Sequence, residues 1–344
     1  MKLPTTRYYG SKRKLVESIW SALEGLGIEY DTVLDLFGGT GVVSYYMARK
    51  GKEVTYNDVM AFNGEIAKAL LCTPKGTFAE KDIPVILRNN PDTKYQYYIR
   101  DLFDDIYYTS MENEIIDVAA QNILKLPVTK RSSAYYVLFQ SCISKRPFNI
   151  FHRKNLNLRV NHVESRFGNK TTWEKSFETL LSNFTRELND VQFIELPRVN
   201  VRNSSALELE EHADLIYIDT PYFSRNSTSV SYHNRYHFLE GLVHYSEIPN
   251  HINYSKVNRE LDFGICPEFE KKSMYIANLH SLLDFHRNSV IALSYTTNGY
   301  PTVDELVQIM MEHKGRVQMV DLGAHSFALN KDNDERREVL IVGY

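Results

Sequence analysis

The sequence predicts an α/β fold in which a mostly parallel sheet is interrupted by a mainly helical insert. Three observations lead to this prediction. Residues 32–59 read as a strand, a helix and a second strand, which is the size of a parallel crossover. Residues 214–218 form a short apolar run that is typical of a buried strand. Residues 289–342 supply three further strands and one helix, which extend the same sheet.

The bulk properties of the chain are those of an ordinary folded protein. It has 344 residues, of which 43% are hydrophobic and 24% charged, and its formal net charge is −3. Overall charge therefore does not indicate nucleic-acid binding, and such a function has to rest on local clusters. No apolar run approaches the ~18 residues that span a bilayer, and residues 1–15 lack the apolar segment of a signal peptide. The cysteines, Cys72, Cys142 and Cys266, match no metal-binding spacing and favour a reducing cytoplasm.

The first candidate site lies in the strand–helix–strand unit. A short apolar strand from Thr32 to Phe37 contains one acid, Asp35. The turn that follows consists of Gly38, Gly39, Thr40 and Gly41. A helix then runs toward Gly51, and the second strand ends at Asp58. Glycines let the backbone approach a ligand closely, and an acid about 20 residues further on can accept hydrogen bonds from ribose hydroxyls. The pattern predicts a nucleoside-binding site.

The position of a second acid indicates which nucleoside is bound. The dinucleotide fingerprint G-x-G-x-x-G is incomplete, because Ser44 stands at its third glycine. Asp35, beside the turn, is badly placed for a pyrophosphate but well placed for a cationic ligand. S-adenosylmethionine carries an ammonium and a sulfonium group and has no phosphate. It is therefore favoured over NAD, although an ordinary α/β turn without a ligand remains an alternative.

A basic stretch near the N-terminus, RYYGSKRKL at residues 7–15, opens a helix at Gly10 and Ser11. Its first turn contains the three cations Lys12, Arg13 and Lys14. Cations at this end of a helix oppose the helix dipole, so an anionic partner is expected. The carboxylate of S-adenosylmethionine or a DNA phosphate fits, and a solvated basic turn is the alternative.

The buried strand at residues 214–218 leads directly into the polar sequence Asp219-Thr220-Pro221-Tyr222. In order along the chain, RYYGSKRKL, DLFGGTG, Asp58 and IDTPYF resemble the α-class, Dam-like DNA adenine N6-methyltransferases. The resemblance covers roughly residues 1–75 and 195–344. These enzymes carry a D-P-P-Y tetrapeptide, and this chain departs from it because Thr220 replaces the first proline.

The chemistry of adenine methylation gives these residues roles without the family. The exocyclic amine is a poor nucleophile because its lone pair is delocalised into the ring. Asp219 can accept a hydrogen bond from one N–H of the amine, and the backbone carbonyl of Thr220 can accept one from the other. Both contacts stabilise charge that develops in the transition state. Pro221 closes the strand. Tyr222 can stack on a base that has been flipped out of the duplex.

A basic segment, SKRPFNIFHRKNLNLR at residues 144–159, is the candidate DNA-binding element. It contains no acid, and its cations alternate with asparagine and aromatic residues. Cations position phosphates, while asparagine and arginine can read base edges. The candidate DNA contacts are Lys145, Arg146, Asn149, His152, Arg153, Lys154, Asn155 and Arg159. A solvated basic loop is the alternative.

The resemblance implies the rest of the organisation. The fold is a Rossmann-like S-adenosylmethionine-dependent methyltransferase fold, with a mixed seven-stranded sheet whose last strand is antiparallel. Residues 1–75 and 196–344 form the catalytic domain, and residues 76–195 form a mainly helical target-recognition insert. The implied cofactor contacts are Tyr8, Gly10, Lys12, Asp35, Phe37, Gly38, Gly39, Thr40, Gly41, Asp58, Ser204 and Asp219.

The expected activity is site-specific adenine methylation in DNA by a bacterial or phage enzyme of the cytoplasm. The expected partners are double-stranded DNA and a cognate restriction endonuclease. Neither membrane association nor a metal is expected, and the chain is expected to be a monomer or weak dimer. Three other readings stay open. The acceptor is cytosine N4, RNA or a protein amide; the chain is a nicotinamide-dependent oxidoreductase; or it is a non-catalytic DNA-binding module.

Overall fold

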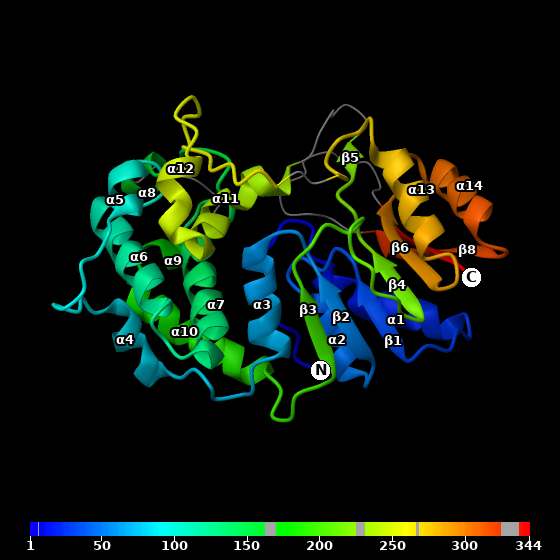
Figure 1. Ribbon diagram of the computed structural model, residues 1–344, viewed down its shortest axis with the longest axis horizontal. Coiled ribbons are helices and arrows are strands. Elements are labelled where there is room, and N and C mark those ends of the chain that lie inside the picture. The colour runs from blue at the N-terminus through cyan, green and yellow to red at the C-terminus, as the bar shows by residue number, and fades with distance from the viewer. Residues whose placement is uncertain (6, 162–169, 225–230, 266–267, 325–336) are drawn as a thin grey trace. The chain divides into compact units, whose positions relative to one another are not determined.

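The computed structural model describes residues 1–5, 7–161, 170–224, 231–265, 268–324 and 337–344, which divide between two compact units (Figure 1). Unit 1 comprises Met1–Tyr9, Met60–Leu196 and Tyr232–Ile265. Unit 2 comprises Gly10–Val59, Pro197–Ser231 and Cys266–Tyr344. The chain therefore passes between the units several times.

Unit 2 contains, within the described residues, a seven-stranded sheet in the order β3-β2-β1-β4-β6-β9-β8. Figure 1 shows β3, β2, β1 and β4 following one another in this order from the left. The strands are β1 (Thr32–Asp35), β2 (Glu53–Asn57), β3 (Val199–Arg202), β4 (Leu215–Ile218), β6 (Val290–Thr296), β8 (Val317–Ala324) and β9 (Arg337–Gly343). A small antiparallel pair, β5 (Phe223–Ser224) with β7 (Gly299–Tyr300), follows β4 and β6.

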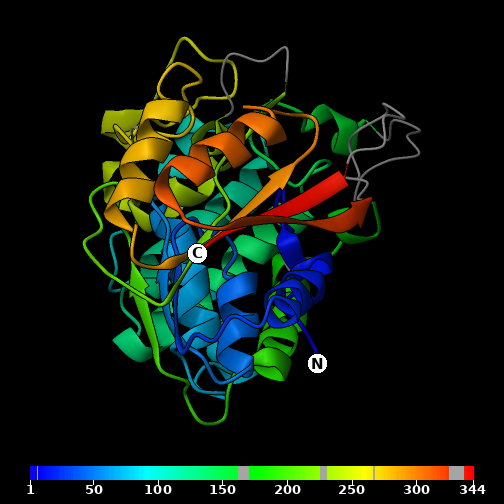
Figure 2. The same cartoon turned by 90° about the vertical axis from the view of Figure 1, so that its right-hand side faces the viewer.

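Strand direction in this sheet confirms the predicted fold. β3, β2, β1, β4 and β6 pair in parallel, whereas β9 pairs antiparallel with both β6 and β8 (Figure 2). The last strand of the chain is thus the antiparallel one. β4 is buried along its whole length, as expected for a parallel strand covered on both faces.

Two layers of helices cover the faces of this sheet. The helices of unit 2 are η1 (Lys12–Lys14), α1 (Val16–Gly25), α2 (Val42–Arg49), α13 (Tyr275–Phe285) and α14 (Val303–His313). Leu34, Ile216 and Ile341 pack in one core cluster with residues of α13 and α14. Because side chains alternate along a strand, Asp35 points to the opposite face, where α2 lies against β1 and β2.

Unit 1 is built from helices in the part of the chain that the structure describes. They are α3 (Ala61–Leu71), η2 (Glu80–Asp82), α4 (Ile83–Leu87), α5 (Tyr98–Leu102), α6 (Ser110–Ile123), α7 (Val128–Ser144), α8 (Asn157–Val160), α9 (Lys170–Trp173), α10 (Phe177–Val191), α11 (Tyr232–Val243), η3 (Tyr245–Glu247) and α12 (Ile248–His251). α7 packs against α3, α6 and α10, and it is buried from Ser133 to Ser144. It is the central helix of this unit.

Besides Met1–Tyr9, two segments outside residues 76–195 belong to unit 1. The first is α3, which lies against α7 and α11. The second contains α11, whose buried Glu240 accepts hydrogen bonds from the backbone N–H groups of Ala61 and Phe62, both at 3.0 Å. A carboxylate at the start of α3 satisfies N–H groups that have no partner inside the helix. This contact joins α3 and α11 in one helical body.

Candidate active site

The acids that the sequence singles out lie at one edge of the unit 2 sheet. Asp35 is the last residue of β1, and Asp58 and Asp219 directly follow β2 and β4. These strands are parallel neighbours, and open α/β sheets bind ligands at the carboxyl ends of their strands. Sheet topology therefore gathers three carboxyl groups that are far apart in the sequence.

The glycine turn after β1 is fastened to the end of β2. Gly39 donates its backbone N–H to Oδ2 of Asp58 at 2.9 Å, and its carbonyl accepts from the hydroxyl of Tyr56 at 2.6 Å. A Cβ at Gly38 would lie 2.2 Å from the ring of Tyr56. Gly41 starts α2 in the left-handed conformation, with φ 71°, which favours glycine. Asp58, expected to contact a ribose, thus also holds the turn in place.

Asp35 is a buried carboxyl group with acceptor capacity left over. Its Oδ2 accepts a hydrogen bond from the hydroxyl of Ser44 at 2.7 Å. Its Oδ1 is buried and has no hydrogen-bond partner among the described residues. Burial raises the pKa of Asp35 to about 7, against the Ser44 hydrogen bond that lowers it, and the charges of Asp219 and Asp58 raise it further. Ser44, at the missing third glycine of the fingerprint, therefore serves as a donor to Asp35.

Asp219 forms an ion pair with buried Lys12. Nζ of Lys12 lies 2.8 Å from Oδ1 of Asp219 and 3.7 Å from Oε2 of Glu338, and the Lys12 side chain is only 3% exposed. Burial lowers the pKa of Lys12, but the charge of Asp219 and neighbouring groups outweighs it and raises the pKa well above its usual value. Burial raises the pKa of Asp219, and Lys12 opposes this shift. The sequence predicted an anionic partner for Lys12, either a cofactor carboxylate or a DNA phosphate, and the structure shows two carboxylates of the chain beside it.

The rest of the tetrapeptide is held by aromatic residues. Thr220 is buried, and its hydroxyl shares a hydrogen bond of 2.6 Å with the hydroxyl of Tyr275 on α13. The ring of half-buried Tyr222 meets Tyr295 edge-on, with centroids 5.6 Å apart. Half-buried Pro221 lies between Thr220 and Tyr222. The side chain of Thr220 therefore supplies a tether that proline lacks, at the position where the chain departs from D-P-P-Y.

Asn57, which sequence reasoning did not single out, makes a second set of side-chain hydrogen bonds at this edge of the sheet. The Asn57 side chain donates to the carbonyls of Leu36 and Ser204, both at 3.1 Å, and accepts from the backbone N–H of Ser204 at 3.1 Å. Next to it, Asn203 donates to the carbonyl of Asp58 at 2.6 Å. An asparagine at the end of a buried strand is a usable signal, because a buried amide requires several partners. These contacts place Ser204 beside the strand-end cluster, by which we mean Asp35, Asp58 and Asp219.

The remaining predicted cofactor residues fall into both units. In unit 2, Gly10 has φ 80°, Phe37 packs edge-on against Phe269, and Thr40 is buried. Tyr8 belongs to unit 1, where its ring stacks on that of Tyr236 with centroids 4.5 Å apart.

Half of the basic segment of unit 1 points inward. Arg146 is fully buried, and its guanidinium donates to the carbonyls of Ile150 at 3.3 Å and Arg153 at 2.9 Å. Nζ of buried Lys145 lies 2.9 Å from Glu112 and donates to the carbonyls of Trp173 and Lys175. Two further residues belong with them: Arg159 pairs with Glu112 at 2.7 Å, and Asn155 is buried. Burial lowers the pKa of Arg146 to about 10. These cations fold the segment.

The other residues of the segment face outward or lie half-buried. Arg153 and Lys154 are exposed, and Lys154 pairs with Asp105 at 2.7 Å. Asn149 is half-buried with φ 61°. His152 is half-buried, and burial together with nearby Arg153 lowers its pKa to about 4, so its ring is neutral at pH 7.

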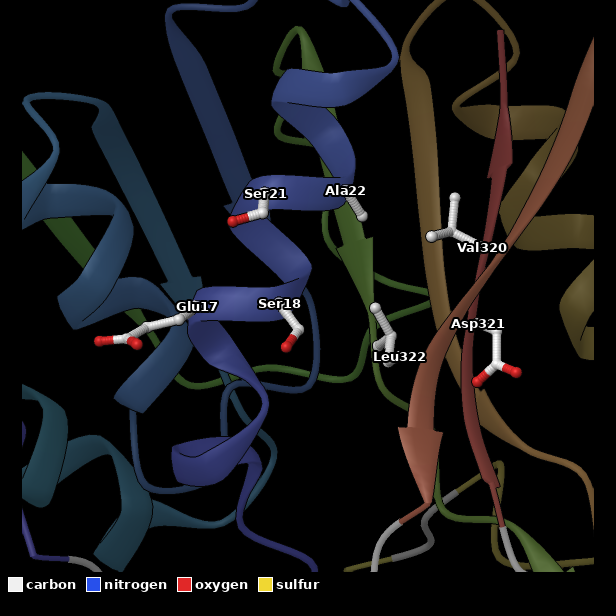
Figure 3. Close-up of a pocket in the computed structure, with 7 residues that line it drawn as sticks. All are labelled: Glu17, Ser18, Ser21, Ala22, Val320, Asp321 and Leu322. Atoms are coloured by element: carbon white, nitrogen blue, oxygen red, sulfur yellow. The ribbon is translucent and has the colours of Figure 1, made fainter.

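A separate surface hollow of about 430 Å³ lies in unit 2 (Figure 3). It is lined by Glu17, Ser18, Ser21 and Ala22 of α1 and by Val320, Asp321 and Leu322 of β8. It shares no residue with the strand-end cluster. Among the described residues, no set of three or more histidine, cysteine or acidic side chains is placed to hold a metal ion. No described helix has the length and apolarity to cross a membrane.

The fold and the strand-end cluster together define a methyltransferase-type α/β protein: a mostly parallel sheet, a glycine turn after its first strand and an antiparallel last strand. The family model described as D12 class N6 adenine-specific DNA methyltransferase matches residues 8–263. The chain belongs to this family, and the resemblance to Dam-like enzymes that the motifs indicate is confirmed.

Characterised relatives support the same assignment. The type II methyltransferase M2.HphI of Haemophilus parahaemolyticus is 23% identical, with 99% of this chain and 97% of that protein covered. The modification methylase LlaI of Lactococcus lactis subsp. lactis is 26% identical over 88% of this chain and 48% of that protein. The modification methylase StsI of Streptococcus sanguinis is 25% identical, with 89% and 46% covered. The chain thus spans about half the length of these two modification methylases.

Proposed function

We propose that this chain transfers the methyl group of S-adenosylmethionine to N6 of adenine at specific sites in DNA, with Asp219 as the group that activates the amine. Family membership gives the reaction class. The observation that supports the residue assignment is the position of the Asp219 carboxylate: it follows β4 at the carboxyl ends of the parallel strands, and Nζ of Lys12 lies 2.8 Å away.

The residues at the sheet edge fit a cationic nucleoside. Oδ1 of Asp35 is a buried acceptor without a partner among the described residues, and an ammonium group is the natural donor for it. Asp58, which follows β2, is the candidate for the ribose hydroxyls. When bound, S-adenosylmethionine supplies an electrophilic methyl group on its sulfonium.

The tetrapeptide then acts on the acceptor. One N–H of the adenine amine donates to Asp219 and the other to the backbone carbonyl of Thr220, so that negative charge faces the nitrogen as it becomes positive in the transition state. The hydrogen bond between the Thr220 side chain and Tyr275 restrains the residue that provides this carbonyl. Tyr222 offers a ring on which the flipped adenine stacks, which offsets part of the few kcal/mol that flipping costs.

Unit 1 is the proposed target-recognition body, and unit 2 the catalytic one. Within the basic segment, exposed Arg153 and Lys154 are the candidates for phosphate contacts, with Asn149 and His152 beside them. The proposed partners are DNA that contains the recognition site and a cognate restriction endonuclease, because two of the relatives are named modification methylases.

The test of this function is the Asp219→Asn variant, which keeps the size of the side chain and removes its charge. We expect kcat to fall about a hundred- to a thousandfold, the usual loss for one electrostatic stabiliser, while the dissociation constant for S-adenosylmethionine stays within about twofold in calorimetry. Exposed Asp304 of α14 provides the matched control as Asp304→Asn. Undiminished activity of Asp219→Asn would contradict the mechanism.

The modified base is identified separately. DNA of mixed sequence is methylated by the wild-type chain, digested to nucleosides and separated by chromatography, and the same DNA is sequenced with modification detection. N6-methyl-2′-deoxyadenosine at one recurring site is the expected product. N4-methyl-2′-deoxycytidine as the product would reassign the acceptor.

A further inference from the structure

A second buried acid, Glu338, stands beside the proposed catalytic pair. It is the second residue of β9, its side chain is 0% exposed, and its Oε2 lies 3.7 Å from Nζ of Lys12. The ammonium group of Lys12 is therefore bracketed by two carboxylates, those of Asp219 and Glu338. The motifs do not include Glu338, because β9 follows the tetrapeptide by more than a hundred residues in sequence.

The sheet explains how Glu338 reaches this position. Val339 and Ile341 of β9 belong to the core that packs with α13 and α14. Since side chains alternate along a strand, Glu338 projects to the opposite face. Its Cα partner on β6 is Thr296, at the end of the strand that adjoins β4. The antiparallel last strand thus delivers an acid to the edge where β4 ends in Asp219.

Placing these charged groups together in the fold costs free energy. Lys12 is buried, Asp219 is 18% exposed and Glu338 is fully buried, and the desolvation cost of such charges is often not recovered by their mutual attraction. Nζ of Lys12 also lies 5.5 Å from the centroid of the Tyr222 ring. An arrangement that is costly to bury and lies at a reactive carboxylate indicates a functional role.

We propose that Glu338 is a positioning residue for methyl transfer: it shares the ammonium group of Lys12 with Asp219, and so fixes Lys12 and leaves the Asp219 carboxylate able to accept the substrate N–H. This inference rests on the proposed function of Asp219. A lysine that served Asp219 alone would satisfy that carboxylate more fully and make it a weaker acceptor for the substrate. In this scheme Glu338 touches neither substrate nor cofactor, and it acts on the reaction through Lys12.

The direct test is Glu338→Gln, which keeps the volume and removes the charge. We expect kcat to fall about tenfold, within the range of coupling between neighbours in one charged network, with KM for DNA and the dissociation constant for S-adenosylmethionine unchanged. Glu338→Asp, which keeps the charge, should retain more activity than Glu338→Gln. The control is Glu24→Gln, at an exposed position on α1. Circular dichroism and thermal unfolding establish that each variant is folded.

A double-mutant cycle with Lys12→Met separates positioning from a merely structural role. Without Lys12, two like charges remain buried together, so Glu338→Gln should then leave kcat unchanged or raise it, the opposite of its effect in the wild type. If Lys12→Met is too slow to assay, the same cycle is measured as unfolding free energy, where Glu338→Gln should be less destabilising in the Lys12→Met background than in the wild type.

Each outcome decides one claim. No methylation by the wild-type chain would remove the proposed function itself. An active wild type with an unchanged kcat in Glu338→Gln, an effect on KM alone, or an equal loss in both Lys12 backgrounds would overturn the role of Glu338 and leave the role of Asp219 standing.

Discussion

Both units contain buried charged residues, but these residues serve different purposes in the two units. In unit 2 the acids Asp35 and Asp219 are collected at the carboxyl ends of parallel strands, and Asp35 keeps an acceptor atom without a partner among the described residues. In unit 1 the cations Lys145 and Arg146 are turned inward and bound to backbone carbonyls. The first arrangement leaves chemical capacity for a ligand, whereas the second uses the charges to hold a loop together.

This difference shows which kinds of sequence signal predict where a side chain lies in the fold. A residue at the end of a parallel strand lies at a known edge of the sheet, whatever the distance along the chain. A run of basic residues has no such constraint, because each side chain can point to solvent or to the interior. Burial of Arg146 is the clearest case, since its neighbour Arg153 in the same segment is exposed.

Replacement of Arg146 should give the largest effect on stability. Arg146→Ala removes donors from the carbonyls of Ile150 and Arg153 and leaves a cavity, so the free energy of unfolding should fall by about 3 kcal/mol or more. Arg153→Ala, at an exposed position, should stay within about 0.5 kcal/mol of the wild type. Urea unfolding measures both. Equal stability of the two variants would erase the distinction between inward and outward cations.

The strand-end residues were predictable from the sequence for a physical reason. Asp35, Asp58 and Asp219 each lie at or directly after the end of a strand, and the parallel arrangement of these strands brings the three residues to one edge of the sheet. The sheet with its antiparallel last strand followed from the family resemblance that the motifs indicate. Glu338 and Tyr275 were not predictable, because they reach Lys12 and Thr220 only through packing of elements far along the chain. The inward direction of Lys145 and Arg146 was hidden for the same reason.

The ionisation of Asp35 should make cofactor affinity depend on pH. Burial raises the pKa of Asp35 to about 7, so the folded chain keeps this proton below pH 7. A cationic ligand favours the ionised form, and its affinity should therefore rise about tenfold between pH 6 and pH 8, the factor expected for one proton that must leave. Calorimetry with S-adenosylmethionine measures this change. Asp35→Asn should bind weakly at both pH values, and a pH-independent affinity of the wild type would contradict the assignment.

The smallest expected effect concerns DNA binding by the outward cations. Arg153→Ala removes one exposed charge from the basic segment, so the dissociation constant for DNA should rise about five- to tenfold with little dependence on sequence, and the slope of log affinity against log salt should fall by about 1. Fluorescence anisotropy at several salt concentrations measures both quantities. Arg186 of α10 is likewise exposed in unit 1 and pairs with Glu80, and Arg186→Ala serves as the matched control. A slope that Arg153→Ala leaves unchanged, or that Arg186→Ala lowers equally, would mean that the basic segment is no special DNA contact and that its cations serve the fold alone.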